Sequence, residues 1–105
     1  MARYTIESDD GNTVVVDTAN ARAHWGEETR WNGNNHISKA TGSQWEHETL
    51  YLSAKGRWYV EHTSQWQGST DTARFVDARE AAAWLLRNDH DLPAELEAAG
   101  AQVSE

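Results

Sequence analysis

Alternation of apolar and polar residues is clearest near the middle of the chain, where it predicts a β-hairpin. In residues 49–53 (TLYLS) and 57–61 (RWYVE), every second residue is a leucine, a valine or a tryptophan. A period of two is typical of a strand with one buried face. A loop of three residues sets Leu50 opposite Val60, whereas a shift by one residue would set Leu50 against Glu61. The pattern and the turn therefore agree on one register.

Polar turn sequences separate further β-branched or aromatic segments and predict more strands. In the first of these, a three-residue loop that ends at Gly11 places Ile6 opposite Val14. In the second, the dipeptide Asn32-Gly33 favours a hairpin turn. The additional strands predicted in this way are residues 3–7 and 13–17, residues 27–31 and 35–38, and residues 72–76.

The C-terminal third has the signals of helices. Asp77 and Glu80 have the spacing of a capping box ahead of the sequence AAAWLLRN, in which Trp84 lies on the face that packs on the sheet. A second short helix is predicted over residues 93–99, because proline favours the first turn and Gly100 is suited to the position just after the end.

Together these elements predict an α+β fold over residues 1–100, as one domain. Hairpins build an antiparallel sheet of about four to six strands, and one or two C-terminal helices pack on one face. Residues 18–26 are predicted to form one or two helical turns that end at Gly26. Residues 101–105 are expected to be a frayed tail. A chain of 105 residues is too short for two domains that each have a core.

Large aliphatic side chains are scarce, which changes the expected role of the tryptophans. Leu, Val, Ile and Phe make up 15 of the 105 residues, and the net charge is −8. Such a composition is typical of disordered chains. The chain also has 6 Trp and 3 Tyr, however, and each aromatic side chain can bury roughly 150–250 Å². Most tryptophans are therefore predicted to lie in the core, which leaves only a minority for a surface.

Charge and composition exclude several classes of function. Residues 21–76 have six basic and six acidic side chains, and both flanking segments are acidic, so no basic patch is available for nucleic acid or an anionic membrane. No apolar run is long enough to span a membrane. The five histidines lack metal-ligand spacing, so we expect neither a metal nor a cofactor. The chain has no cysteine, which favours a cytoplasmic location.

The tripeptide Ser-Gln-Trp occurs twice, at residues 43–45 and 64–66. The predicted register places the two copies side by side at the open end of the central hairpin, and a β-bulge would turn both indoles to one face. Indoles ringed by amides are typical of recognition surfaces. The alternative is that the indoles close the end of the core. The predicted partner-binding residues are Gln44, Trp45, Gln65 and Trp66, with Tyr51, Arg57 and Tyr59 on a sheet face expected to be exposed.

Glu48 and His62 are predicted to lie opposite each other, on the face of the central hairpin that contains Leu50 and Val60. A carboxylate that orients an imidazole is one element of general acid–base catalysis. A cross-strand pair that contributes ~0.2–1 kcal/mol to stability explains the same placement. No nucleophile or third catalytic group accompanies the pair, so we predict that the chain is not an enzyme.

These observations predict a small acidic protein that binds another protein through the aromatic and amide residues of its central hairpin. A role as an accessory protein or inhibitor of a larger machine suits its size. Three alternatives stay open. They are a module that binds carbohydrate or another small polar ligand, a small enzyme that uses Glu48 and His62, and a homodimer formed through the tryptophan-rich sheet face.

Overall fold

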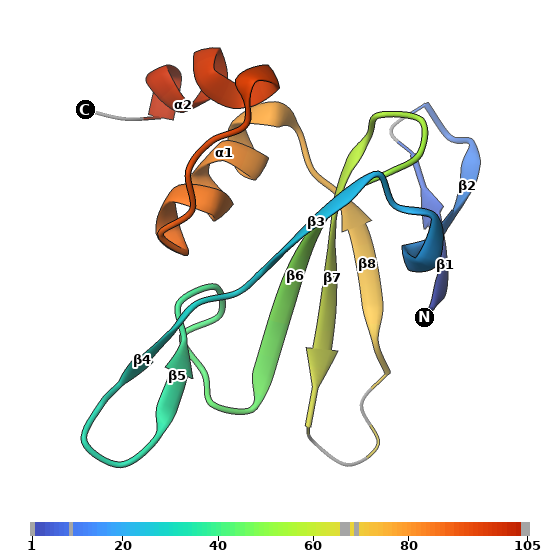
Figure 1. The fold of residues 1–105 in the computed structure, drawn as a ribbon. Helices are drawn as coiled ribbons and strands as arrows, with labels where there is room; N and C mark the ends of the chain where they lie inside the picture. Colours follow the sequence, from blue (N-terminus) through green and yellow to red (C-terminus); the bar gives the residue numbers. More distant parts are fainter. Residues whose placement is uncertain (1, 9, 66–67, 69, 104–105) are drawn as a thin grey trace.

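Four antiparallel strands in the order β3-β6-β7-β8 form the central sheet of the computed structural model (Figure 1). The structure describes residues 2–8, 10–65, 68 and 70–103. The α+β class and the antiparallel, hairpin-built sheet are as predicted. The strands of the central sheet are β3 (Ala23–Gly26), β6 (Glu46–Leu52), β7 (Trp58–Ser64) and β8 (Thr72–Phe75).

The central hairpin, β6–β7, has the predicted register. Leu50 pairs with Val60, and Tyr51 pairs with Tyr59 on the opposite face. The turn has the predicted three-residue loop, in which Gly56 adopts a φ of +85° that other residues rarely reach. Pattern and turn chemistry thus specified the pairing without any distant contact.

Two shorter hairpins flank the central sheet. The first has the predicted register, with Ile6 opposite Val14, and its turn has a hydrogen bond from the Ser8 amide to the Asn12 carbonyl at 2.8 Å. The first hairpin lies beside β8, and the second projects from one end of the molecule (Figure 1). The strands are β1 (Arg3–Glu7) with β2 (Thr13–Asp17), and β4 (Thr29–Trp31) with β5 (His36–Ser38).

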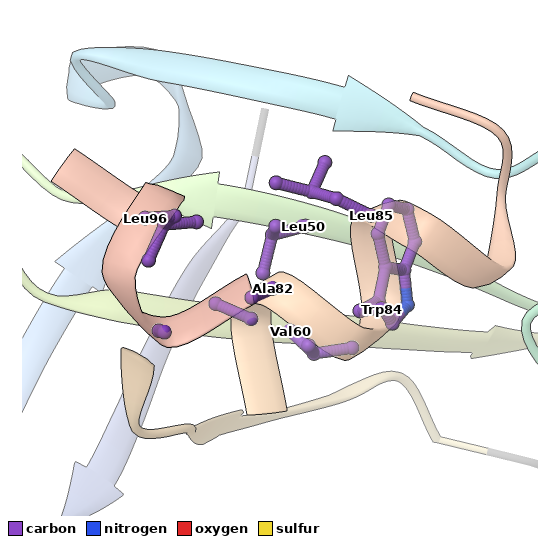
Figure 2. Packing of buried hydrophobic residues seen from close by; sticks show 8 residues of the cluster. Leu50, Val60, Ala82, Trp84, Leu85 and Leu96 are labelled. Atoms are coloured by element: carbon purple, nitrogen blue, oxygen red, sulfur yellow. The ribbon is translucent and has the colours of Figure 1, made fainter. Parts of the chain in front are cut away.

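The helices cover one face of the sheet, as predicted. The carboxylate of Asp77 caps α1 by accepting a hydrogen bond from the Glu80 amide at 2.8 Å. Trp84 and Leu85 of α1 are buried against Leu50 of the sheet, and Figure 2 shows this packing. The helical segments in this layer are α1 (Ala78–Arg87), the 3₁₀ turn η2 (Ala94–Leu96) and α2 (Glu97–Val103).

The β1–β2 hairpin covers part of the other face of the sheet and forms a second core. Ile6 and Val16 from the hairpin pack with Tyr59 from the sheet, and all three are buried. The hydroxyl of Tyr4 donates a hydrogen bond of 2.5 Å to Glu61 of β7 and so fastens the hairpin to the sheet. The molecule therefore has three layers, with helices, sheet and hairpin in that order.

The helix predicted over residues 18–26 is wrong. A single 3₁₀ turn, η1 (Thr18–Asn20), is followed by strand β3, which pairs with β6. The side chains alternate along β3, so Trp25 is half-buried and packs on Trp58 with ring centroids 5.4 Å apart. Burial of this indole on a strand outweighs the weak helical preference of the segment.

The predicted end of the second helix is also wrong. Helix α2 continues through Gly100 to Val103, so residues 101–103 are helical instead of frayed, and residues 104–105 lie outside the described part of the chain. A Cβ atom at Gly100 would come within 2.1 Å of the Leu92 side chain. Glycine is therefore present to allow close packing inside the helix, not to end it.

Candidate functional site

The two ends of the central hairpin that contain the repeated tripeptide lie side by side, as the register predicted. Trp45 precedes β6 and Gln65 follows β7, and the Gln65 amide donates a hydrogen bond to the Trp45 carbonyl at 2.8 Å. The Trp45 side chain is 42% exposed, Gln65 is exposed and Gln44 is half-buried. The second predicted indole, Trp66, lies outside the described residues.

Another tryptophan at this end is more exposed and was missed by the sequence patterns. Trp31 of β4 is 60% exposed, and its ring lies 5.1 Å from that of His36 on β5. The turn beyond them is fixed by the Asn32 side chain, which accepts hydrogen bonds from the amides of Asn34 and Asn35 at 2.9 and 2.8 Å. A tryptophan in a hairpin whose one other large apolar residue is Ile37 was the available signal, because such a hairpin has little apolar area to bury it.

Hydrogen bonds tie the end of the β4–β5 hairpin to the loop that leads into β6. The Ser38 amide donates to the Ser43 carbonyl at 3.0 Å, and the Trp45 amide donates to the Ser43 hydroxyl at 3.0 Å. The β4–β5 hairpin and the start of β6 consequently lie toward the same end of the molecule, the lower end in Figure 1. We call Trp31, Gln44, Trp45 and Gln65 the Trp31–Trp45 surface.

The carboxylate of Glu27 holds this end together from the inside. It is 13% exposed, and one oxygen accepts hydrogen bonds from the Ser38 hydroxyl at 2.9 Å and the Glu48 amide at 2.7 Å. Its other oxygen lies 2.7 Å from Nδ1 of His47. Three partners from β5 and β6 therefore converge on one carboxylate that is largely shielded from solvent, which fixes the base of the projecting hairpin.

Glu48 and His62 face each other across the strands as predicted, at a distance of 3.5 Å between Oε2 and Nδ1. The other ring nitrogen of His62 lies 3.4 Å from Glu46, so both nitrogens face carboxylates. The remaining Glu48 oxygen accepts a hydrogen bond from the Trp84 indole at 3.1 Å. A general base needs a ring nitrogen directed at a substrate, and in this geometry both nitrogens of His62 face carboxylates.

The expected exposure of the tyrosine face is wrong for Tyr59, which is fully buried beneath the β1–β2 hairpin. Its ring stacks on that of half-buried Tyr51, with centroids 5.1 Å apart and planes 10° apart. The guanidinium of Arg57 is exposed and lies 3.6 Å from the centre of the Phe75 ring. These three residues thus lie under or beside the first hairpin, apart from the Trp31–Trp45 surface.

Burial of the tyrosine side chains makes the protein less stable at alkaline pH. Burial raises the pKa of Tyr59 to about 12, and burial followed by the charge of Glu61 raises the pKa of Tyr51 above its usual value. The tyrosine pKa is 10 in the unfolded chain and higher in the folded protein. The stability gained from the neutral buried phenol is therefore complete below pH 10 and is lost as the pH rises toward 12.

We therefore expect the urea midpoint of unfolding to fall between pH 10 and about 12, with the near-ultraviolet absorbance of tyrosinate rising over the same interval. The Tyr59→Phe variant removes one titrating group and should lose less stability there. An equal fall in the variant would contradict a role for Tyr59.

The described residues offer no site for a metal and no membrane span. Within residues 2–8, 10–65, 68 and 70–103, no group of three or more His, Cys, Asp or Glu side chains could hold a metal ion. In the same part of the chain, none of the helices has the length and apolar character required to cross a membrane.

Comparison of the chain with protein-family models, with curated proteins and with solved structures found no match.

Proposed function

We propose that this protein binds another protein through the Trp31–Trp45 surface. The observation that supports the proposal is the exposure of Trp31 and Trp45, at 60% and 42%. The chain is short of aliphatic residues and uses its other described tryptophans, Trp25, Trp58 and Trp84, in or against the core. Two exposed indoles contribute little buried apolar area to a chain that is short of it, so their exposure calls for another explanation. Exposed aromatic side chains beside amides are typical of recognition surfaces.

The base of this surface is preorganised, which also supports binding. The Glu27 carboxylate and the hydrogen bonds of Ser38 and Ser43 fix the β4–β5 hairpin before a partner arrives. Preorganisation lowers the entropy lost on association. Residues 21–76 have no net charge, so shape and hydrogen bonds dominate recognition and the affinity should depend weakly on salt. A role as an accessory protein or inhibitor in the cytoplasm completes the proposal.

The test is affinity capture from native cell extract with the wild type and the Trp31→Ala/Trp45→Ala double variant. We expect a protein retained by the wild type to be reduced at least about tenfold with the double variant. Leu86→Ala is the matched control, because Leu86 is also exposed, at 41%, but lies on α1. Equal capture by the double variant, once circular dichroism has established that it is folded, would refute the proposal.

A carbohydrate or another small polar ligand is the second candidate. The observation in its favour is that the backbone of exposed Trp45 pairs with that of exposed Gln65, because an indole face stacks on a sugar ring while an amide bonds its hydroxyls. Titration with a panel of glycans should then quench tryptophan fluorescence in the wild type and not in Trp45→Ala. Flat titrations in both proteins would count against this candidate.

A further inference from the structure

A groove of about 610 Å³ runs along strand β2, and none of its lining residues belongs to the Trp31–Trp45 surface. All five residues of β2, Thr13–Asp17, line it. The segment between β6 and β7 contributes Lys55 and Arg57, and the sheet contributes Tyr59 and Phe75. A groove that follows a whole strand has the shape of an extended segment of chain.

Strand β2 presents an open edge to a partner strand. Among the described residues it pairs only with β1. The Ser8 amide donates to the Asn12 carbonyl, and the Thr18 amide donates to the Ala2 carbonyl. The residue pairs that exchange hydrogen bonds between β1 and β2 are therefore the even-numbered ones. In an antiparallel ladder, the odd-numbered residues of β2 then direct their N–H and C=O groups away from β1. At the centre of this edge, the Val15 side chain is 63% exposed.

The groove concentrates positive charge in an acidic protein. Arg3 in its lining forms an ion pair with Asp17 at 3.5 Å, and Lys55 and Arg57 add two further positive charges, whereas the whole chain has a net charge of −8. Arg57 is held in place by its contact with the Phe75 ring, at 3.6 Å. A local positive potential favours an acidic ligand.

A buried hydroxyl in the lining also lacks a partner. The Tyr59 side chain is fully buried, and its Oη has no hydrogen bond among the described residues. Buried polar groups are nearly always bonded, so this hydroxyl is a polar group beside the groove that the fold alone leaves without a partner. Burial raises the pKa of Tyr59 to about 12, so the hydroxyl remains a donor at neutral pH.

We propose that the groove binds an extended acidic segment of a partner protein, which adds as a strand to the edge of β2. The main chain of the segment would pair with the odd-numbered residues of β2, and its carboxylates would reach Lys55 and Arg57. A second copy of this chain fits less well, because pairing two β2 edges would bring the same cations together.

The first test measures fluorescence anisotropy of a labelled alternating Glu-Val peptide about as long as β2. We expect the wild type to bind it at least about tenfold more tightly than a matched Lys-Val peptide. The Lys55→Gln/Arg57→Gln variant should also weaken binding of the acidic peptide about tenfold or more. Absence of binding, or equal affinity for both peptides, would overturn the proposal.

The second test addresses the strand edge itself. Val15→Pro removes an outward amide while leaving the β1–β2 hydrogen bonds in place, so it should fold and weaken binding about tenfold or more. N-methylation of alternate peptide residues gives the same test from the ligand side if the variant does not fold. Unchanged affinity for both N-methyl registers would overturn strand addition.

Two other occupants are distinguished by further measurements. Competition by glutamate or inorganic phosphate at the concentration at which the unlabelled peptide competes would assign the groove to a small anion instead. A dimer of wild type in sedimentation experiments that Val15→Pro abolishes would assign it to a second copy. Either result would overturn the assignment to an acidic segment.

Discussion

Trp84→Ala is expected to lower the free energy of unfolding by about 3–5 kcal/mol. The indole is buried between α1 and the sheet, where it belongs to the same cluster as Leu50 and Val60 (Figure 2). Its truncation leaves a cavity and removes the donor that faces Glu48 at 3.1 Å. Because small domains are stable by only about 5–15 kcal/mol, urea unfolding should shift to a far lower midpoint.

Leu86→Ala is the matched control, since Leu86 is two residues further along α1 and is 41% exposed. That variant should change the free energy of unfolding by about 0.5 kcal/mol or less. If the two variants lost the same stability, the packing of α1 on the sheet through Trp84 would be wrong.

Glu27→Ala is expected to cost about 2–4 kcal/mol of stability, a large effect for one glutamate. It removes the acceptor shared by the Ser38 hydroxyl and the Glu48 amide, together with the partner of His47. The amide of Glu48 lies just beyond the last β3–β6 pair, Gly26 with Thr49, so the Glu27 carboxylate takes the place of a backbone acceptor there. Urea unfolding followed by circular dichroism measures the change.

Glu28→Ala provides the comparison, because Glu28 is the next residue, is exposed, and its carboxylate accepts only from the neighbouring Thr29 amide among the described residues. It should cost well under about 1 kcal/mol. The Glu27→Ala variant should also weaken partner capture by the Trp31–Trp45 surface, because the base of the β4–β5 hairpin loosens. Equal stability of the two variants would contradict the role assigned to Glu27.

Elements whose partners are close in sequence could be predicted, and their registers with them. The pairing of Leu50 with Val60 follows from alternation together with a turn that needs glycine at position 56. The start of α1 follows from the side chain of Asp77, which caps the helix within three residues. In both cases all the determining interactions lie within one short window of the chain.

Strand β3 could not be predicted, because what decides its conformation lies elsewhere in the chain. Residues 23–26 pair with residues 49–52 of β6, and the burial of Trp25 depends on Trp58. For the same reason the exposure of Tyr59 was misjudged. Alternation assigns Tyr59 to a face of the sheet, but it cannot reveal that the β1–β2 hairpin covers that face.

In the candidate site, too, some features could be predicted from the sequence and others could not. Trp45 and Gln65 could be placed side by side, because the register of the central hairpin extends to its open end. The role of Glu27 could not be foreseen, because its partners Ser38, His47 and Glu48 lie 11 to 21 residues further along the chain. A repeated tripeptide located the region but not its most exposed indole.

Most strands of this fold pair with their nearest neighbour along the chain, which has a kinetic consequence. Four strand pairs each close a short loop: β1–β2, β4–β5, β6–β7 and β7–β8. Among the described strands, only β3 pairs with a strand that is not its neighbour in sequence, because β4 and β5 lie between β3 and β6 along the chain. Short loops lose little entropy on closure, and a low contact order is associated with rapid folding. The meander β6–β7–β8 can thus form early, and docking of β3 completes the sheet last.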